Sequence, residues 1–318
     1  MSTATWLARP DGAYRHEALF YADGDDFLGA TAGFLKAGIA AGEASLVVVS
    51  AEKIRWLRAA LGADADAVFF ADMAGVGANP ARIIPAWHRF VDGQRAAGRR
   101  MRGIGEPIWA SRTPDELVEC QRHEDLLNVA FVDAPGFWLL CPYDLSALPR
   151  DVLDEAERSH PYVTQGGSAA ASATYRGLDA FAAPFATPLA PPPDDAVELP
   201  FDARRLEGMR GAVAVRAEDA GFTKARRDDL ALAVYEVVVN SVRHGGGGGI
   251  LRMWNTPEAV VCEVEDGGHI DHPLAGREAP PTDSTGGRGL WLVNHLCDLV
   301  QLRSSLRGTV IRMHMWRR

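Results

Sequence analysis

The chain has 318 residues and a formal net charge of −9, with 47% hydrophobic and 24% charged residues. This length exceeds the ~100 to 200 residues of a usual domain, so two domains are expected, and no apolar run approaches the ~18 to 20 residues that span a bilayer. Basic and acidic residues nearly balance in residues 199–318, so the acidic excess lies before them. Because no element concentrates basic charge, direct nucleic-acid binding is excluded from the expected functions.

The first residues and the cysteines point to one compartment. The opening MSTATWLARPDGAYRHE lacks the charged-then-apolar order of a secretory signal, which predicts a cytoplasmic protein without a membrane partner. The cysteines are widely spaced and form no CxxC pair, so we expect buried thiols in place of a disulfide framework or zinc ribbon. They are Cys120, Cys141, Cys262 and Cys297.

Residues 1–164 alternate strand-like and helix-like stretches. The expected strands are HEALFY, SLVVVS, AVFFAD, RRMRGIGE and FWLLCPYD. Between them, DDFLGATAGFLKAGIAAG and the segments 83–97 and 113–132 have apolar residues at helical spacing. This order predicts an α/β domain with a parallel-rich sheet.

Residues 165–198 are rich in Ala, Ser, Gly and Pro and end in ATPLAPPPDDAVELP. Consecutive prolines supply no backbone donors and favour an extended chain. We therefore predict a linker here, separating residues 1–164 from a second domain over residues 199–318.

The second domain is expected to begin with helices over 203–220 and 223–244, followed by a glycine run. The strands ILRMWN, AVVCEVED, LVQLRS and GTVIRMHMW come later, with GLWLVNHLCD as a short helix among them. Helices before strands predict an α+β two-layer sandwich with the helices on one face of a mixed sheet.

Three segments of this domain carry chemistry. In the helix DDLALAVYEVVVNSVRHG, Glu236, Asn240 and His244 follow one another at intervals of four residues and share a stripe. An amide oxygen is a hard ligand suited to Mg²⁺, and a carboxylate can deprotonate a hydroxyl nucleophile. An exposed polar stripe on an amphipathic helix is the alternative.

The other two segments are rich in glycine. Asp266-Gly267-Gly268 ends a strand and suits an adenine amino group, with an ordinary Asp-Gly turn as the alternative. Thr285 to Leu290, TGGRGL, leads into a helix whose first amides suit phosphate oxygens, with an unliganded loop as the alternative. The preceding HPLAGREAPPTDS is a loop that can close over a nucleotide.

Together, in this order, the three segments resemble the GHKL ATPase superfamily. The resemblance implies a histidine-kinase-like (Bergerat) fold, with Glu236 and Asn240 in the N box and Thr309 near the adenine pocket. Asp266 and Gly268 match the first glycine box, and Gly287 and Gly289 match the second. Ile270 stands where many members have another glycine.

The compact size, the opening ELPFDARRLEGMRGAVAVRAEDAGF and the short lid resemble anti-sigma-factor serine/threonine kinases most closely. That resemblance implies ATP and Mg²⁺ as cofactors, an alternative sigma factor and a STAS-type antagonist as partners, and a homodimer. It implies that Asn240 coordinates Mg²⁺, Glu236 is catalytic and Asp266 reads adenine. The phosphate segment would comprise Gly287, Arg288, Gly289 and Leu290.

Two other functions remain open for this domain. A sensor histidine kinase would need an acceptor histidine on a helical hairpin just before the ATP domain, where the predicted linker lies. The fragment HEDLLN at His123 lacks the following proline, and no hairpin is predicted around His160. A degenerate, non-catalytic ATP domain that only holds partners is the second alternative.

Residues 14–165 resemble the MEDS sensory domain, which implies a RecA-like α/β fold. The match rests on HEALFYADGDDFLGATAGFLKAGIAAGE, RGIGEPIW, FWLLCPYDLS and SHPYV, and no GxxxxGK[ST] phosphate loop occurs there. Six side chains are predicted at strand ends, where an open α/β sheet binds ligands. They are His16, Tyr21, Glu106, Trp109, Cys141 and Tyr143.

The hypothesis for that crevice is a small-molecule or redox signal. His16, Glu106 and Cys141 are the principal sensory candidates, and a metal site made of these three is left open. Core packing and strand capping are the alternative roles of these side chains.

Overall fold

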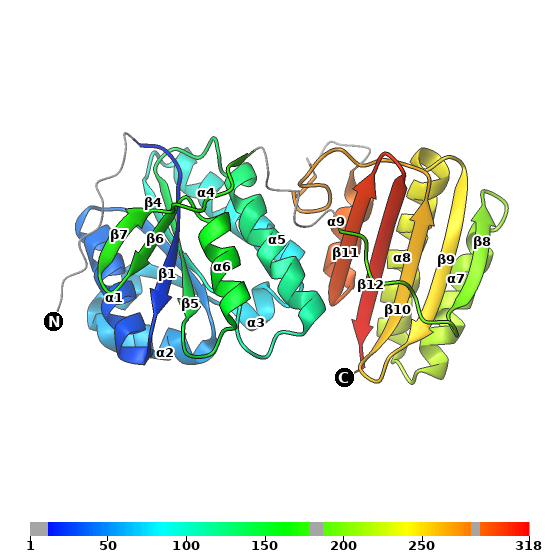
Figure 1. Ribbon diagram of the computed structural model, residues 1–318, viewed down its shortest axis with the longest axis horizontal. Helices are drawn as coiled ribbons and strands as arrows, with labels where there is room; N and C mark the ends of the chain where they lie inside the picture. Colours follow the sequence, from blue (N-terminus) through cyan, green and yellow to red (C-terminus); the bar gives the residue numbers. More distant parts are fainter. Residues whose placement is uncertain (1–11, 179–186, 281–286, 318) are drawn as a thin grey trace. The chain divides into compact units, whose positions relative to one another are not determined.

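The computed structural model describes residues 12–178, 187–280 and 287–317 (Figure 1). The chain divides into two compact units, residues 1–182 and 183–318. Within the described ranges, no helix has both the length and the apolar character needed to cross a membrane.

The first unit is a seven-stranded sheet in the order β3-β2-β4-β5-β1-β6-β7, parallel except for the last pair. Its strands are β1 (Arg15–Tyr21), β2 (Ala44–Val49), β3 (Val68–Asp72), β4 (Met101–Gly105), β5 (Phe137–Asp144), β6 (Tyr162–Gln165) and β7 (Ser168–Ala171). Its helices are α1 (Gly24–Ala40), α2 (Ala51–Leu61), α3 (Met73–Val76), α4 (Ile83–Ala96), α5 (Pro114–Ala130) and α6 (Arg150–Ser159), with 3₁₀ turns at Gly62–Ala67 and Pro80–Arg82. The predicted parallel-rich α/β sheet is confirmed.

Capping side chains determine where several of these helices begin. The side chain of Asp23 accepts from the backbone N–H of Asp26 at the start of α1, and Thr113 forms a capping box with Glu116 at the start of α5. On one face of the sheet, Phe34 of α1 and Leu57 of α2 pack in the core with strand residues such as Val47. Because β1 alternates, His16 points to the opposite face.

The predicted linker is shorter than expected. Ser168–Ala171 pairs with β6 as an antiparallel strand, and Val197–Asp202 is the first strand of the second unit. Between them, the carbonyl oxygens of Thr187 and Ala190 accept hydrogen bonds from Arg303 and Arg312 of the second sheet. The backbone carbonyls of these two residues are thereby paired with side chains of the second unit.

The second unit is a five-stranded sheet in the order β11-β12-β10-β9-β8 with three helices. The strands are β8 (Val197–Asp202), β9 (Gly248–Asn255), β10 (Ala259–Asp266), β11 (Leu299–Ser305) and β12 (Gly308–Trp316). The helices are α7 (Leu206–Asp219), α8 (Lys224–His244) and α9 (Arg288–Leu296). This is the expected two-layer α+β architecture.

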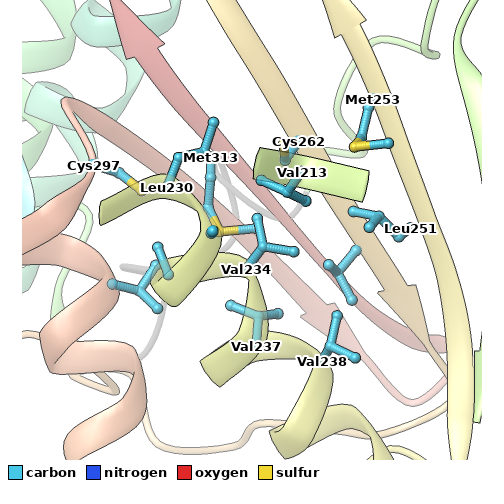
Figure 2. Close-up of a cluster of buried hydrophobic side chains, with 14 of the residues drawn as sticks. Val213, Leu230, Val234, Val237, Val238, Leu251, Met253, Cys262, Cys297 and Met313 are labelled. Atoms are coloured by element: carbon cyan, nitrogen blue, oxygen red, sulfur yellow. The ribbon is translucent and has the colours of Figure 1, made fainter. Parts of the chain in front are cut away.

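Every described strand pair of this sheet is antiparallel, so the expectation of a mixed sheet was wrong. Short turns join β9 to β10 and β11 to β12, and such hairpins can only pair antiparallel strands. The helices bury Val234, Val237 and Val238 of α8 against Leu251 and Met313 of the sheet (Figure 2). This core packs α8 against the sheet.

Candidate functional site

Helix α8 presents the first polar pair. Its N-cap is Thr223, whose hydroxyl accepts from the N–H of Arg226. Val237, Val238 and Ser241 are buried, whereas Glu236 and Asn240 are half-buried one turn apart. The core stripe of the helix therefore fixes the direction in which this acid and this amide point.

The start of α9 lies directly against that pair. A Cβ atom at Gly289 would lie 2.8 Å from Nδ2 of Asn240 and 3.2 Å from Oε2 of Glu236, so any other residue would require Asn240 to move. Gly287, the N-cap of α9, has a φ of 81° and no side chain to cap the first-turn amides. Those amides and the positive end of the helix dipole suit an anion. Thr285 and Gly286 lie outside the described residues.

Asp266 ends β10, and contacts on both sides fix its carboxylate. Its Oδ2 accepts from the hydroxyl of Ser241 at 2.6 Å, and its Oδ1 accepts from the N–H of Gly268 at 2.7 Å. A carboxylate has about four lone-pair positions, so the two oxygens retain acceptor capacity for a ligand amino group.

Thr309 connects the sheet to the loop after Asp266. Its hydroxyl donates to the carbonyl oxygen of Gly268 at 2.9 Å and lies 2.7 Å from the hydroxyl of Ser304. Ser304 in turn accepts from the N–H of Ile270 at 2.8 Å. Ile270, which occupies the position where a glycine is often expected, is therefore bound to Ser304 through its backbone N–H. A glycine would supply the same donor.

These groups surround a cavity of about 580 Å³, a size typical of small-molecule sites. Seven of the predicted residues line it: Asn240, Asp266, Gly268, Gly287, Gly289, Leu290 and Thr309. His244 also lines it. Glu236 and Arg288 are absent from the lining; Glu236 borders Gly289, and Arg288 is exposed.

The six side chains predicted at strand ends of the first unit do not form one group. His16 lies near the amino end of β1 and Cys141 in the interior of β5, so neither lies at the carboxyl ends of the strands, where an open α/β sheet binds ligands. Cys141 Sγ lies 3.4 Å from Nε2 of His16. Burial lowers the pKa of His16 to about 4, with the neighbouring His160 as the next cause.

Glu106 belongs to another set of contacts. It directly follows β4, accepts from the hydroxyl of Tyr21 at 2.8 Å and pairs with Nζ of Lys53 at 2.5 Å. Burial raises its pKa against the opposing effect of Lys53. The set His16, Glu106 and Cys141 is therefore not brought together, because residues 16 and 21 of a strand point to opposite faces.

The remaining two candidates have local roles. The ring of Trp109 lies under the guanidinium of Arg112, with 3.8 Å from Cζ to the ring centroid. Tyr143 is buried in β5, and its ring meets the imidazole of His160 edge-on at 5.6 Å. Of the six, His16, Cys141 and Tyr143 thus lie in the interior beside His160.

Comparisons with known proteins agree with this division of the chain. Residues 15–161 match the MEthanogen/methylotroph, DcmR Sensory domain, MEDS, and residues 199–315 match the histidine kinase-like ATPase domain. The chain joins a MEDS domain to a histidine kinase-like ATPase domain. Both resemblances expected from the sequence are confirmed at the level of the domain.

A crystal structure of the RsbU and RsbW domains of Rv1364c from Mycobacterium tuberculosis is similar to 41% of this chain. The identity is 18%, the TM-score is 0.30, and the match spans 34% of that chain's length. No curated protein matches the chain.

The sequence did not reveal two contacts of the ATPase domain. Ser241 orients the carboxylate of Asp266. The sequence feature that could have indicated this contact is a hydroxyl side chain on the buried stripe of α8. Asn294 of α9 donates to the carbonyl oxygen of Gly276 at 2.8 Å and so holds the loop that forms one wall of the cavity. Nothing in the sequence around Asn294 indicates that contact.

Proposed function

We propose that the ATPase domain binds ATP with Mg²⁺ and transfers the γ-phosphoryl group to a serine or threonine of a partner protein. The supporting observation is that Asn240 and Asp266 line one cavity with the uncapped start of α9, and that Glu236 borders Gly289 beside it. By the resemblance stated above, the acceptor is a STAS-type anti-sigma-factor antagonist and the controlled protein is an alternative sigma factor.

The residues present fit such a nucleotide. Asp266 is held by Ser241 and Gly268 with acceptor capacity left for the adenine amino group. The first amides of α9 suit the phosphates, as does the dipole of that helix. Bound ATP and Mg²⁺ would supply the phosphoryl group and the cation that neutralises its charge.

The remaining roles follow from position and chemistry. The side-chain oxygen of Asn240 suits Mg²⁺, which prefers hard oxygen ligands. Glu236 is half-buried beside Gly289, where it can accept the proton of an incoming hydroxyl. Leu290 lines the cavity directly after Gly289, and exposed Arg288 would add positive charge near the phosphates.

The signal would enter through the MEDS domain, and we place the whole switch in the cytoplasm. The support for that location is that all four cysteines are free, buried thiols, as in a reducing compartment. A homodimer is part of the same proposal, on the resemblance alone.

The test is incubation of the purified protein with γ-labelled ATP, Mg²⁺ and a candidate antagonist, beside Glu236→Gln and Asn240→Ala. Acid-stable label on the antagonist, absent with both variants, is the expected result. Acid-labile label on the protein itself would instead indicate a histidine kinase. Nucleotide binding without transfer to any partner would indicate a non-catalytic holding module.

A further inference from the structure

Four side chains with metal-binding atoms meet inside the MEDS domain. They come from four separate elements: His16 from β1, Glu124 from α5, Cys141 from β5 and His160 from the segment after α6. One ligand atom of each lies within 4.8 Å of the others, and all four residues are buried. The grouping was not apparent from the sequence, where Glu106 took the place of Glu124.

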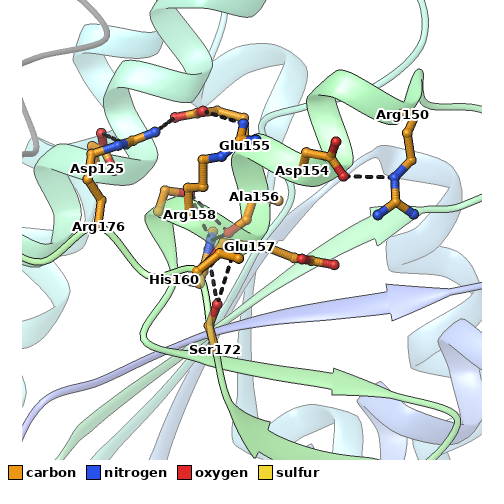
Figure 3. Close-up of polar contacts among 12 residues, drawn as sticks. Asp125, Arg150, Asp154, Glu155, Ala156, Glu157, Arg158, His160, Ser172 and Arg176 are labelled. Atoms are coloured by element: carbon orange, nitrogen blue, oxygen red, sulfur yellow. Dashed lines mark hydrogen bonds and ion pairs between the residues drawn. The ribbon is translucent and has the colours of Figure 1, made fainter.

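The orientation of both imidazoles is fixed by contacts of their Nδ1 atoms. Nδ1 of His16 lies 3.1 Å from Oδ1 of Asn128, whose amide nitrogen donates to the carbonyl oxygen of Ser159. Nδ1 of His160 lies 2.8 Å from the carbonyl oxygen of Ala156 (Figure 3). Since these oxygens can only accept, each Nδ1 donates its hydrogen, which leaves the Nε2 atom of each ring facing the cluster. Metal-bound histidines are held in this manner.

At the centre of the cluster, the carboxylate of Glu124 lies close to both imidazoles. Oε2 of Glu124 lies 3.2 Å from Nε2 of His16 and 3.4 Å from Nε2 of His160. Among the described residues, Nε2 of His160 and Oε1 of Glu124 are buried and have no hydrogen-bond partner. A carboxylate oxygen and a ring nitrogen left without partners in a dry interior are unfavourable, and a cation bound by both removes that cost.

We propose that this cluster is a zinc site with His16, Glu124, Cys141 and His160 as its ligands. Imidazole, thiolate and carboxylate together suit Zn²⁺. Zinc bonds of about 2.0 to 2.3 Å place tetrahedral ligand atoms roughly 3.3 to 3.6 Å apart. The distance of 3.4 Å between Cys141 Sγ and His16 Nε2 already falls in that range.

Charge balance supports the same ion. On binding, the thiol of Cys141 would release its proton to solvent, so that one thiolate and one carboxylate offset the two positive charges of Zn²⁺. The completed site would be neutral, as its full burial requires. Its four protein ligands make it a closed site that ties β1 and β5 to the helical layer of the MEDS domain.

The experiment uses the full-length protein purified without chelator. Elemental analysis should find about one zinc per chain, and replacement with Co²⁺ should produce a thiolate-to-cobalt charge-transfer band. Cys141→Ser should abolish the band and His160→Gln should weaken metal retention against a chelator. Cys120→Ser is the matched control, since Cys120 is an equally buried thiol that donates to the carbonyl oxygen of Pro107 outside the cluster.

The site is overturned if folded wild-type protein contains no stoichiometric zinc and gives no charge-transfer band with Co²⁺. It is also overturned if Cys141→Ser keeps the band. Should the variants fail to fold, the zinc content and cobalt spectrum of the wild type still decide. Because this site lies outside the ATPase domain, phosphotransfer and zinc content fail or succeed independently.

Discussion

The two domains assemble their sites from different parts of the polypeptide. In the ATPase domain, glycine backbone, a helix start and a few polar side chains surround a cavity of about 580 Å³. In the MEDS domain, four buried side chains converge without glycine loops. A backbone-lined cavity suits a ligand that enters and leaves, whereas a buried cluster suits an ion that stays.

Glu236→Gln tests whether the ATPase cavity serves catalysis. Phosphotransfer should fall by about 10² to 10⁴, the usual contribution of general-base catalysis, while ATP affinity changes by less than about threefold because Glu236 does not line the cavity. Initial rates and ATP titrations on the same preparation measure both. Equal loss of binding and rate would assign Glu236 a structural role in the pocket.

Asp266→Asn tests the adenine contact. The substitution removes a charged acceptor of two hydrogen bonds, at about 1.5 to 3 kcal/mol, so ATP affinity should fall roughly 10- to 100-fold. Asp219→Asn, at the exposed end of α7, is the matched control. Discrimination of ATP against GTP should fall in parallel, and undiminished discrimination would mean that Asp266 does not read the base.

Gly289→Ala tests the close approach of α9 to α8. The new methyl would meet Asn240 at 2.8 Å, and overpacking of this kind costs about 1 to 3 kcal/mol. Weaker ATP binding is therefore expected. Gly208→Ala in α7 has open space around the added Cβ and should be neutral or stabilising. If thermal unfolding and ATP titration do not distinguish the two variants, Gly289 does not lie as close to Asn240 as in the structure.

Glu106→Gln should have the smallest effect on the unfolding free energy. It tests Glu106 as a buried carboxyl that is not part of the metal cluster. Burial raises its pKa above 4.5, so its carboxyl favours the folded state at low pH and that contribution is lost as pH rises through the folded-state pKa. The unfolding free energy of wild type minus variant should therefore decrease above pH 4.5. Urea unfolding at a series of pH values measures it, and a constant difference contradicts the raised pKa.

The contrast also explains what the sequence could predict. The ATPase residues lie in short motifs such as EVVVN and DGG, whose roles depend on local backbone geometry, and seven of them were found to share one cavity. The hydrogen bond from Ser241 to Asp266 was not predicted, because the two residues are 25 positions apart.

The MEDS domain was harder because its contacts are long-range. Residues 16 and 124 are 108 positions apart, and no spacing rule relates them. Knowing that side chains alternate along β1 was insufficient without the register between β1 and β5. That register pairs Cys141 with Ala18, two residues from His16 on the same face of the sheet, where the two side chains meet. The start of the predicted linker was placed too early for a similar reason, since pairing of β7 with β6 is a tertiary feature.

The most direct test of the central claim is calorimetric titration of ATP into the full-length protein with and without Mg²⁺, for wild type and Asn240→Ala. The account predicts binding at one site that Mg²⁺ strengthens in the wild type, with the Mg²⁺ effect lost in Asn240→Ala. No ATP binding by the wild type, or an equal Mg²⁺ effect in both proteins, would contradict it.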